Sequence, residues 1–352
     1  MLKALVKFKL RQHYAETLLD ADCVVIGGGQ LIADKDLNFP RKILGALGEI
    51  ENDQSPVAIF GAGVTKEFTK KGQSLFERAF RDQLVSVHVR DQFSVERWNR
   101  NFKQPAARKV WDPGFLSSEI YPTPFKQKRP RPIVGLGITH PETLSLHSDD
   151  QKDALSSEDW ISFFCDVASD LQERGANVEL FTNGAADDQE FARLVQQAYF
   201  EAFPTEPALA LAEVPLVPAQ LAATIGFYDA IISHRLHANI IAYSFNIPHI
   251  GLGWDSKMQG YFSETEREEY LVTAPRVSAA QSVGALAMRA LKEGIQPALL
   301  VQIQREIHQQ TGDLVKSLSE TLSAIQSETN SVVNLHEPLV EVGPTRSREL
   351  KS

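Results

Sequence analysis

The chain has 352 residues, which is long enough for two domains of ordinary size. Its formal net charge of -9, with 43% hydrophobic and 23% charged residues, is typical of a globular protein and argues against a disordered chain or a general binder of nucleic acid. No apolar run approaches the roughly 18 residues of a membrane span, and two distant cysteines predict neither a disulfide scaffold nor a cysteine metal site.

Short apolar segments alternate with helical segments in the first part of the chain. The apolar segments cover 23–29, 57–63 and 84–90, and the helical ones cover 68–80 and 94–102. Apolar runs of this length that end in a tight turn predict buried parallel strands. Their alternation with helices predicts an α/β domain whose ligand-binding loops lie at the carboxyl ends of the strands.

A proline-rich segment at 121–132 separates this part from a second series of the same kind. Its four prolines and several cations follow no period, which is typical of an extended linker. After it we predict strands at 133–139, 177–184, 229–237 and 246–254, and helices at 159–173, 187–202, 218–225, 238–245, 278–293 and 297–325.

These elements predict two doubly wound Rossmann-like domains followed by a tail. The first domain is expected to cover residues 1–128 and the second 129–327. Beyond residue 327 the chain is polar and has no apolar period, so 328–352 are expected to be disordered. Two such domains bring two sets of strand ends to one cleft, and this arrangement can bind a donor and an acceptor from opposite sides.

A glycine cluster, Gly27, Gly28 and Gly29, directly follows the first predicted strand. Consecutive glycines let backbone amides approach an anion closely. The cluster matches neither the dinucleotide motif nor the P-loop motif, because position 32 is Ile and no GK[ST] ending occurs. A plain tight turn between strand and helix is the alternative.

Two charged residues follow strand ends or turns in the first half. Arg90 stands where the strand 84–90 stops, so its cation points toward the crevice in which such folds bind ligands. The alternative is an ion pair with Asp91 that only holds the loop. Asp112 lies in the sequence WDPGF, where it can cap a helix, bond a ligand hydroxyl or form part of a plain turn.

The densest group of chemically active residues is His234, Arg235 and His237, in the sequence SHRLHANIIA. It follows a strand and precedes an apolar helix, so two imidazoles and a guanidinium share one turn beside a helix N-terminus. This combination predicts an anion pocket with a proton donor. A zinc site is the less supported alternative, because no HExxH motif or nearby cysteine accompanies it. Lys257 follows the next strand and either lies in the same crevice or is solvated.

The segments CVVIGGGQL, GAGV, VRDQFS, WDPGF, GLGITHP and SHRLHANIIAYSFNIPHIGLGWDSK together resemble the polysaccharide pyruvyl transferase family in both order and spacing. The resemblance implies a fold similar to the glycosyltransferase B type. It also implies transfer of the enolpyruvyl group of phosphoenolpyruvate to a sugar of an exopolysaccharide or cell-surface glycan, as a cyclic ketal. No cofactor and no catalytic metal are implied, since phosphoenolpyruvate is the donor substrate.

The resemblance also assigns roles to residues. It places the acceptor on the first domain and phosphoenolpyruvate on the second, with His237 as the general acid and base. Members usually begin with a further strand–loop–helix unit before the segment that starts here at Asp22, so the first domain is expected to be shortened at its N-terminus. His140 stands where relatives often have an arginine. Arg90, Arg235, Leu236 and Lys257 are predicted to bind phosphoenolpyruvate, and Gly28, Gly29, His140 and His234 are further candidates for substrate binding.

Two other functions remain open from the sequence. One is a nucleotide-sugar-dependent glycosyltransferase of the B-type fold, since His- and Arg-rich turns also bind diphosphates. The other is a non-catalytic glycan-binding homologue. The expected partners are phosphoenolpyruvate and a free or lipid-linked glycan, without nucleic acid. We expect a cytoplasmic protein, and a lipid-linked acceptor would place it peripherally at the inner face of the membrane.

Overall fold

The computed structural model shows two compact units. Unit 1 consists of residues 1–88, 94–108 and 310–352, and unit 2 of 89–93 and 109–309. The sequence-based boundary between residues 128 and 129 lies at the edge of 123–128, which are outside the described residues. The structure describes residues 12–18, 20–34, 37–50, 55–103, 105–122, 129–147, 155–253, 256–273 and 279–334.

Unit 1 is built on a four-stranded sheet in the order β1-β2-β3-β4, in which β1 and β2 are parallel. Every residue of β2 is buried, as expected of its uninterrupted apolar sequence VAIFGA. Aromatic rings of the helices pack together, with Trp98 4.4 Å from Phe102 between ring centroids. The elements are β1 (Val24–Gly27), α2 (Asn38–Leu47), β2 (Val57–Ala62), α3 (Lys70–Phe80), β3 (Leu84–Val89), α4 (Gln92–Asn101) and β4 (Ala107–Lys109).

Unit 2 is built on a six-stranded parallel sheet in the order β10-β9-β8-β5-β6-β7. The chain starts in the middle at β5, extends to one edge through β6 and β7, and then returns to β8 on the other side of β5. This is the doubly wound Rossmann order, and its switch point lies between β5 and β8. The strands are β5 (Ile133–Gly137), β6 (Asn177–Phe181), β7 (Ala210–Leu211), β8 (Ala230–Ser233), β9 (His249–Gly253) and β10 (Leu271–Thr273).

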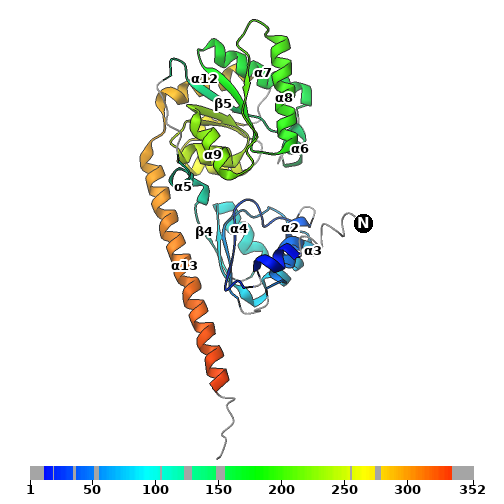
Figure 1. Cartoon of the computed structure of the whole chain (residues 1–352), viewed down its shortest axis with the longest axis vertical. Helices are drawn as coiled ribbons and strands as arrows, with labels where there is room; N and C mark the ends of the chain where they lie inside the picture. The colour runs from blue at the N-terminus through cyan, green and yellow to red at the C-terminus, as the bar shows by residue number, and fades with distance from the viewer. Residues whose placement is uncertain are drawn as a thin grey trace, which may run out of the picture. The chain divides into compact units, whose positions relative to one another are not determined.

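Helices cover both faces of this sheet (Figure 1). Ala230 and Ile232 of β8 belong to a large apolar core with α7 and α12, whereas Ile231 belongs to a smaller core with α9 and α10. Alternate residues of the strand therefore enter different layers. The helices are α5 (Ser117–Ile120), α6 (Pro141–His147), α7 (Ser157–Glu173), α8 (Ala186–Ala202), α9 (Pro218–Phe227), α10 (Leu236–Ser244), α11 (Ser256–Glu264), α12 (Ala280–Glu293) and α13 (Pro297–Asn334).

All seven predicted strands and all eight predicted helices are present within a few residues of their expected ends. One boundary is wrong: α13 continues to Asn334, into the segment expected to be a disordered tail from residue 328. Its apolar residues at helical spacing, including Leu314 and Leu318, are buried, and a helix anchored in this way continues through polar residues that have no breaker. Residues 335–352 are outside the described part of the chain. None of the described helices is both long and apolar enough to cross a membrane.

Candidate active site

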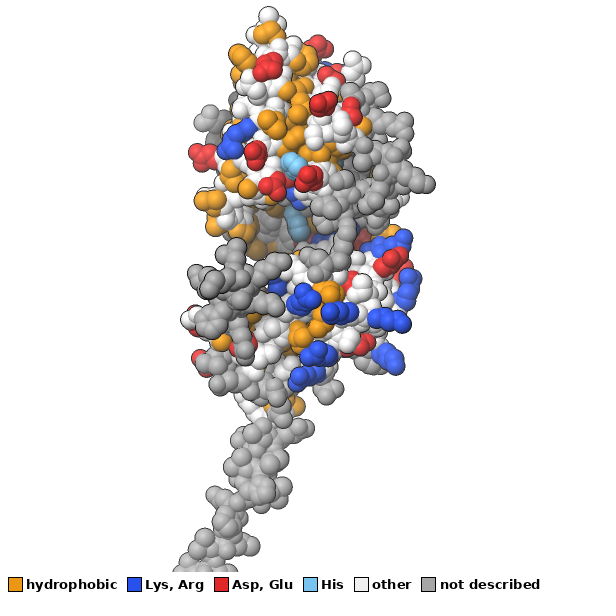
Figure 2. Space-filling model, turned by 90° about the vertical axis from the view of Figure 1, so that its right-hand side faces the viewer, with side chains coloured by type: hydrophobic (Ala, Val, Ile, Leu, Met, Phe, Trp, Pro, Cys, Tyr) orange, Lys and Arg blue, Asp and Glu red, His pale blue; other side chains and the backbone are white. Residues whose placement is uncertain are grey.

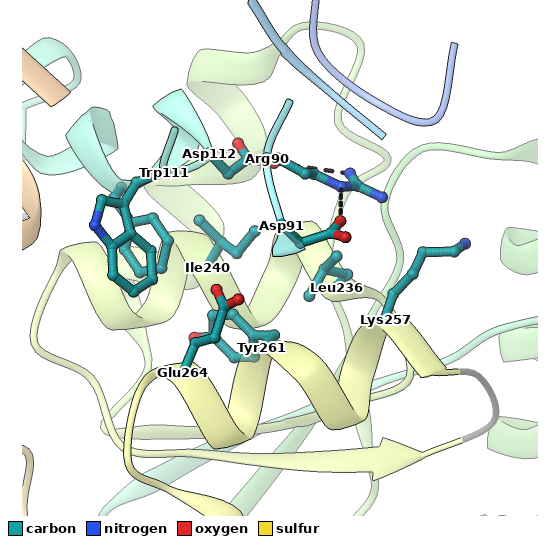
Figure 3. Close-up of a pocket in the computed structure, with 10 residues that line it drawn as sticks. Arg90, Asp91, Trp111, Asp112, Leu236, Ile240, Lys257, Tyr261 and Glu264 are labelled. Atoms are coloured by element: carbon teal, nitrogen blue, oxygen red, sulfur yellow. Dashed lines mark ion pairs between the residues drawn. The ribbon is translucent and has the colours of Figure 1, made fainter. Parts of the chain in front are cut away.

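A pocket opens at the carboxyl ends of the strands of unit 2 and is built entirely from residues of that unit (Figure 3). It encloses about 350 Å³, counting the part that is open to solvent. Its walls come from the loop after β3, the segment after β4, and helices α10 and α11. The residues that line it are Arg90, Asp91, Trp111, Asp112, Phe115, Leu236, Ile240, Lys257, Tyr261 and Glu264.

Arg90 is held in the pocket wall by two carboxylates. Only 7% of its surface is exposed. Its Nε lies 3.6 Å from Oδ2 of Asp91, and its Nη1 lies 3.7 Å from Oδ2 of Asp112. The predicted alternative, an Arg90–Asp91 pair, is thus present, but the same guanidinium also faces the pocket (Figure 3). A guanidinium fixed at two points is a pre-ordered donor for an anionic ligand.

Asp112 has two separate contacts. Its Oδ1 accepts a hydrogen bond from the backbone N–H of Gly114 at 2.9 Å and so caps the short 3-10 helix Pro113–Leu116, as one of the sequence-based alternatives predicted. Its Oδ2 lies 3.7 Å from Arg90 Nη1 and 3.7 Å from Nε2 of His237. The cap therefore fixes a carboxylate between the two residues that the sequence singled out for anion binding and proton transfer.

His237 is the second residue of α10, and 46% of its side chain is exposed. Its pKa lies below the usual value of 6.5, mainly because neighbouring groups exclude water from part of the ring and so disfavour its charged form. The cations Arg90 and Lys257 lower the pKa further, and only the Asp112 carboxylate opposes them. His237 is therefore mostly neutral at pH 7, with a lone pair available to accept a proton.

The other end of the pocket is aromatic and acidic. Trp111 donates from Nε1 to Oε2 of Glu306 at 2.7 Å, which fixes the orientation of the indole. The ammonium of Lys109 lies 4.2 Å from the centroid of that ring and 3.1 Å from Oε2 of Glu264. Figure 3 shows Trp111 and Glu264 at one side of the pocket and the charged ends of Arg90 and Lys257 at the other.

A family model described as polysaccharide pyruvyl transferase matches residues 2–256, which is most of the chain. The protein belongs to the polysaccharide pyruvyl transferase family. The match includes Arg90, Asp112 and His237, and Lys257 follows its last residue directly. No curated protein shows detectable sequence similarity to this chain.

Solved structures similar to this pyruvyl transferase family member are glycosyltransferases and sugar epimerases. A glycosyltransferase from Rickettsia africae has 10% identity and a TM-score of 0.54, over 90% of this chain and 82% of that chain. The UDP-GlcNAc 2-epimerase of Methanocaldococcus jannaschii, solved with UDP-GlcNAc and UDP, has 10% identity and a TM-score of 0.51, over 80% of this chain and 74% of that chain. At such low identity the similarity shows the fold alone, and that fold is the glycosyltransferase B type expected from the sequence.

Arg235 and His140 meet at the switch point of the sheet rather than in the pocket wall. Arg235, at the N-terminus of α10, pairs through Nη2 with Oδ2 of Asp188, a carboxylate with no exposed surface. The other oxygen of Asp188 accepts the backbone N–H of His140 at 2.9 Å. One buried carboxylate on α8 thus ties together the loops that follow β5 and β8.

His234 is placed differently from its neighbours. Its ring has no exposed surface and packs edge-on against Trp160 at 5.0 Å and Phe164 at 6.0 Å between centroids. Burial, helped by the nearby Arg235 charge, lowers its pKa to about 3, so the ring stays neutral. The structure therefore places His234 in the apolar core and not against the pocket.

Gly28 and Gly29 lie in unit 1, in the turn after β1. Both have positive φ, 77° and 52°, a backbone conformation that favours glycine. The carbonyl of Gly29 accepts the N–H of Gly63 at 2.8 Å, which joins this turn to the one after β2. The glycines therefore form the tight turn that the sequence offered as the alternative, and their substrate-binding role stays a prediction.

Sequence reasoning missed Asp188, Trp111 and Glu264. Asp188 lies in the first turn of a predicted helix that follows a strand end, and an acidic residue at this position is a signal that the sequence does contain. Trp111 and Glu264 reach the pocket only because of tertiary packing. Among the residues that the structure describes, no group of three or more His, Cys, Asp or Glu side chains could hold a metal ion.

The charges around His237 predict how its pKa responds to substitution. In the Asp112→Asn variant the pKa of His237 should fall, because the only neighbour that raises it is lost while the cap to Gly114 can persist. In Lys257→Gln it should rise, because a nearby cation is lost. Histidine NMR titration of the free protein measures both changes, with Lys292→Gln as the matched control, since the side chain of Lys292 is exposed. Equal titration in all four proteins would contradict this electrostatic description.

Proposed function

We propose that this protein transfers the enolpyruvyl group of phosphoenolpyruvate to a sugar of an exopolysaccharide or cell-surface glycan and forms a pyruvate ketal. The observation that carries the proposal is that Arg90 and Lys257 line one pocket in a member of this family, while His237 lies 3.7 Å from Asp112 of the pocket wall. Phosphoenolpyruvate carries a carboxylate and a phosphate, so a chain of net charge -9 needs several cations at one site to bind it.

The proposed reaction balances with one residue that both accepts and donates protons. Two sugar hydroxyls each lose a proton, one proton joins the methylene carbon of phosphoenolpyruvate, and the other joins the leaving phosphate. Protonation of the methylene makes the adjacent carbon oxocarbenium-like; one hydroxyl oxygen bonds to it, the C–O bond to phosphate breaks, and the second hydroxyl closes the ketal. Neutral His237, beside Asp112 of the pocket wall, is the group suited to accept a hydroxyl proton and then return it.

In this proposal the two ends of the pocket take different parts of the substrates. Arg90 and Lys257 would hold the anionic donor, whereas the charge of Arg235 is already paired with Asp188 outside the pocket wall. A pyranose presents apolar C–H faces and hydroxyls, which suit an aromatic ring and a carboxylate such as Trp111 and Glu264. In this proposal the donor and the sugar would meet between these two ends of the pocket.

Thermal unfolding against phosphoenolpyruvate tests the donor without knowledge of the acceptor. A ligand at about 100 times its Kd stabilises the folded protein by about 2.7 kcal/mol, which is a readable rise in Tm. We expect this rise for the wild-type protein, a large reduction for Lys257→Ala, and no reduction for Lys292→Ala, whose side chain is exposed on α12.

Nucleotide sugars are measured in parallel with phosphoenolpyruvate. A rise in Tm with a nucleoside diphosphate sugar alone would favour the glycosyltransferase alternative. A rise with glycan alone, without turnover of either donor, would favour a non-catalytic glycan-binding homologue. Each result is distinct from the one that the pyruvyl transfer proposal requires.

A further inference from the structure

Two neighbouring helices of unit 1 carry a local charge opposite to that of the whole chain. Helices α2 and α3 pack against each other and together contain five Lys and Arg residues against one acidic residue, Glu77. All five cations are exposed. The basic face of α2 and α3 is defined by these side chains: Arg41, Lys42, Lys70, Lys71 and Arg78.

Among the described residues, none of the five side chains that define this face has an ion-pair partner. Lys70 and Lys71 occupy the first turn of α3, beside the N-cap Thr69, whose backbone N–H and hydroxyl donate to the buried carboxylate of Asp34. This carboxylate offsets part of the positive end of the helix dipole but forms no ion pair with either lysine. Lys71 and Arg78 are seven residues apart and therefore share one side of α3. Such an arrangement costs electrostatic energy in the free protein, and a bound anionic surface would recover it.

Apolar side chains accompany the cations. Figure 2 shows Lys and Arg side chains spread over one face of unit 1, around a smaller area of hydrophobic side chains. Helix α2 contributes Phe39, Ile43 and Leu44, each of which is only partly buried. Mixed cationic and apolar surfaces of this kind fit the interface of a bilayer, where headgroup phosphates meet acyl chains.

We propose that the basic face of α2 and α3 docks this protein on a bilayer of anionic lipids. The net charge of -9 describes the whole chain, whereas α2 and α3 together hold five cations and one acidic residue. Duplex nucleic acid would also attract the cations, but its phosphate backbone offers no partner to the partly buried aliphatic side chains Ile43 and Leu44 of α2, whereas lipid chains do. The inference stands on unit 1 alone and does not depend on the reaction proposed for unit 2.

Vesicle co-sedimentation tests the proposal with the full chain. Vesicles of pure phosphatidylcholine are compared with vesicles that contain phosphatidylglycerol, at low and high salt. A test variant in which four cations of the basic face are replaced by glutamine is compared with a control in which four exposed cations of unit 2 are replaced in the same way. The test variant is Arg41→Gln/Lys42→Gln/Lys70→Gln/Lys71→Gln, and the control is Arg131→Gln/Arg193→Gln/Lys292→Gln/Arg305→Gln.

We expect the wild-type protein and the control to bind the anionic vesicles, and high salt to release them. The test variant should lose at least about tenfold in its partition coefficient, since each removed cation weakens the attraction. A Tm without ligand and a circular dichroism spectrum equal to those of the wild-type protein show that the variant is folded, whatever the outcome with phosphoenolpyruvate. Equal vesicle binding by the test and control variants, equal binding to neutral vesicles, or tighter binding to duplex DNA than to vesicles would overturn the proposal.

Discussion

The His237→Gln variant should release phosphate from phosphoenolpyruvate about 10²–10⁴ times more slowly than the wild-type protein, which is the usual contribution of a general acid and base. Glutamine keeps a similar size and can still bond to Asp112, whose Oδ2 lies 3.7 Å from the ring, but it does not titrate. The rise in Tm with phosphoenolpyruvate should survive, because Arg90 and Lys257 remain. Loss of the rate with retention of donor binding would assign proton transfer to His237.

The measurement uses a panel of synthetic glycosides that differ in their sugar. Phosphate release identifies an acceptor for the wild-type protein, and a new methyl resonance in the product identifies the ketal. His308→Gln is the matched control, since His308 is exposed and pairs with Glu119 outside the pocket. A His237→Gln variant that turns over at the wild-type rate would remove His237 from the mechanism.

Much of the fold could be predicted because its signals are local. Buried parallel strands such as β2 and β8 are continuous apolar runs, and their length and flanking turns distinguish them from helices. The missed strands β4, β7 and β10 have only two or three residues each and lie at the edges of their sheets, so they are too short to show any period. Their strand character comes from the neighbours that pair with them.

The placement of the candidate residues was predictable where strand ends define it and unpredictable where side chains cross the fold. Arg90 lines the pocket and His237 lies beside Asp112 of its wall, because parallel strands gather their carboxyl ends at one edge, while the roles of both residues stay predictions. His234 shows the limit of this rule: it is three residues from His237, yet it points into the core against Trp160. Asp188 pairs with Arg235 across a sequence separation of 47 residues, so no local sequence pattern includes both.

Two buried histidines, His234 of the turn after β8 and His249 of β9, make unit 2 sensitive to acid. His234 and His249 have no exposed surface, and burial lowers the pKa of each to about 3. In the unfolded chain each ring takes up a proton near its usual pKa of 6.5. Between these two values protons favour the unfolded state, so stability is complete above about pH 6.5 and declines as the pH falls. The slope is up to about 1.4 kcal/mol per pH unit for each histidine.

The His234→Phe variant should therefore lose less stability than the wild-type protein between pH 6.5 and 4.5. A phenyl ring fits a site bounded by Trp160 and Phe164 and has no proton to gain. Urea midpoints followed by tryptophan fluorescence at both pH values measure the effect, since Trp160 contacts the substituted ring. His308→Phe, at an exposed position, should keep the wild-type dependence on pH. If His234→Phe lost as much stability as the wild-type protein, the acid sensitivity would have to come from other groups, such as carboxylates that must be protonated on unfolding.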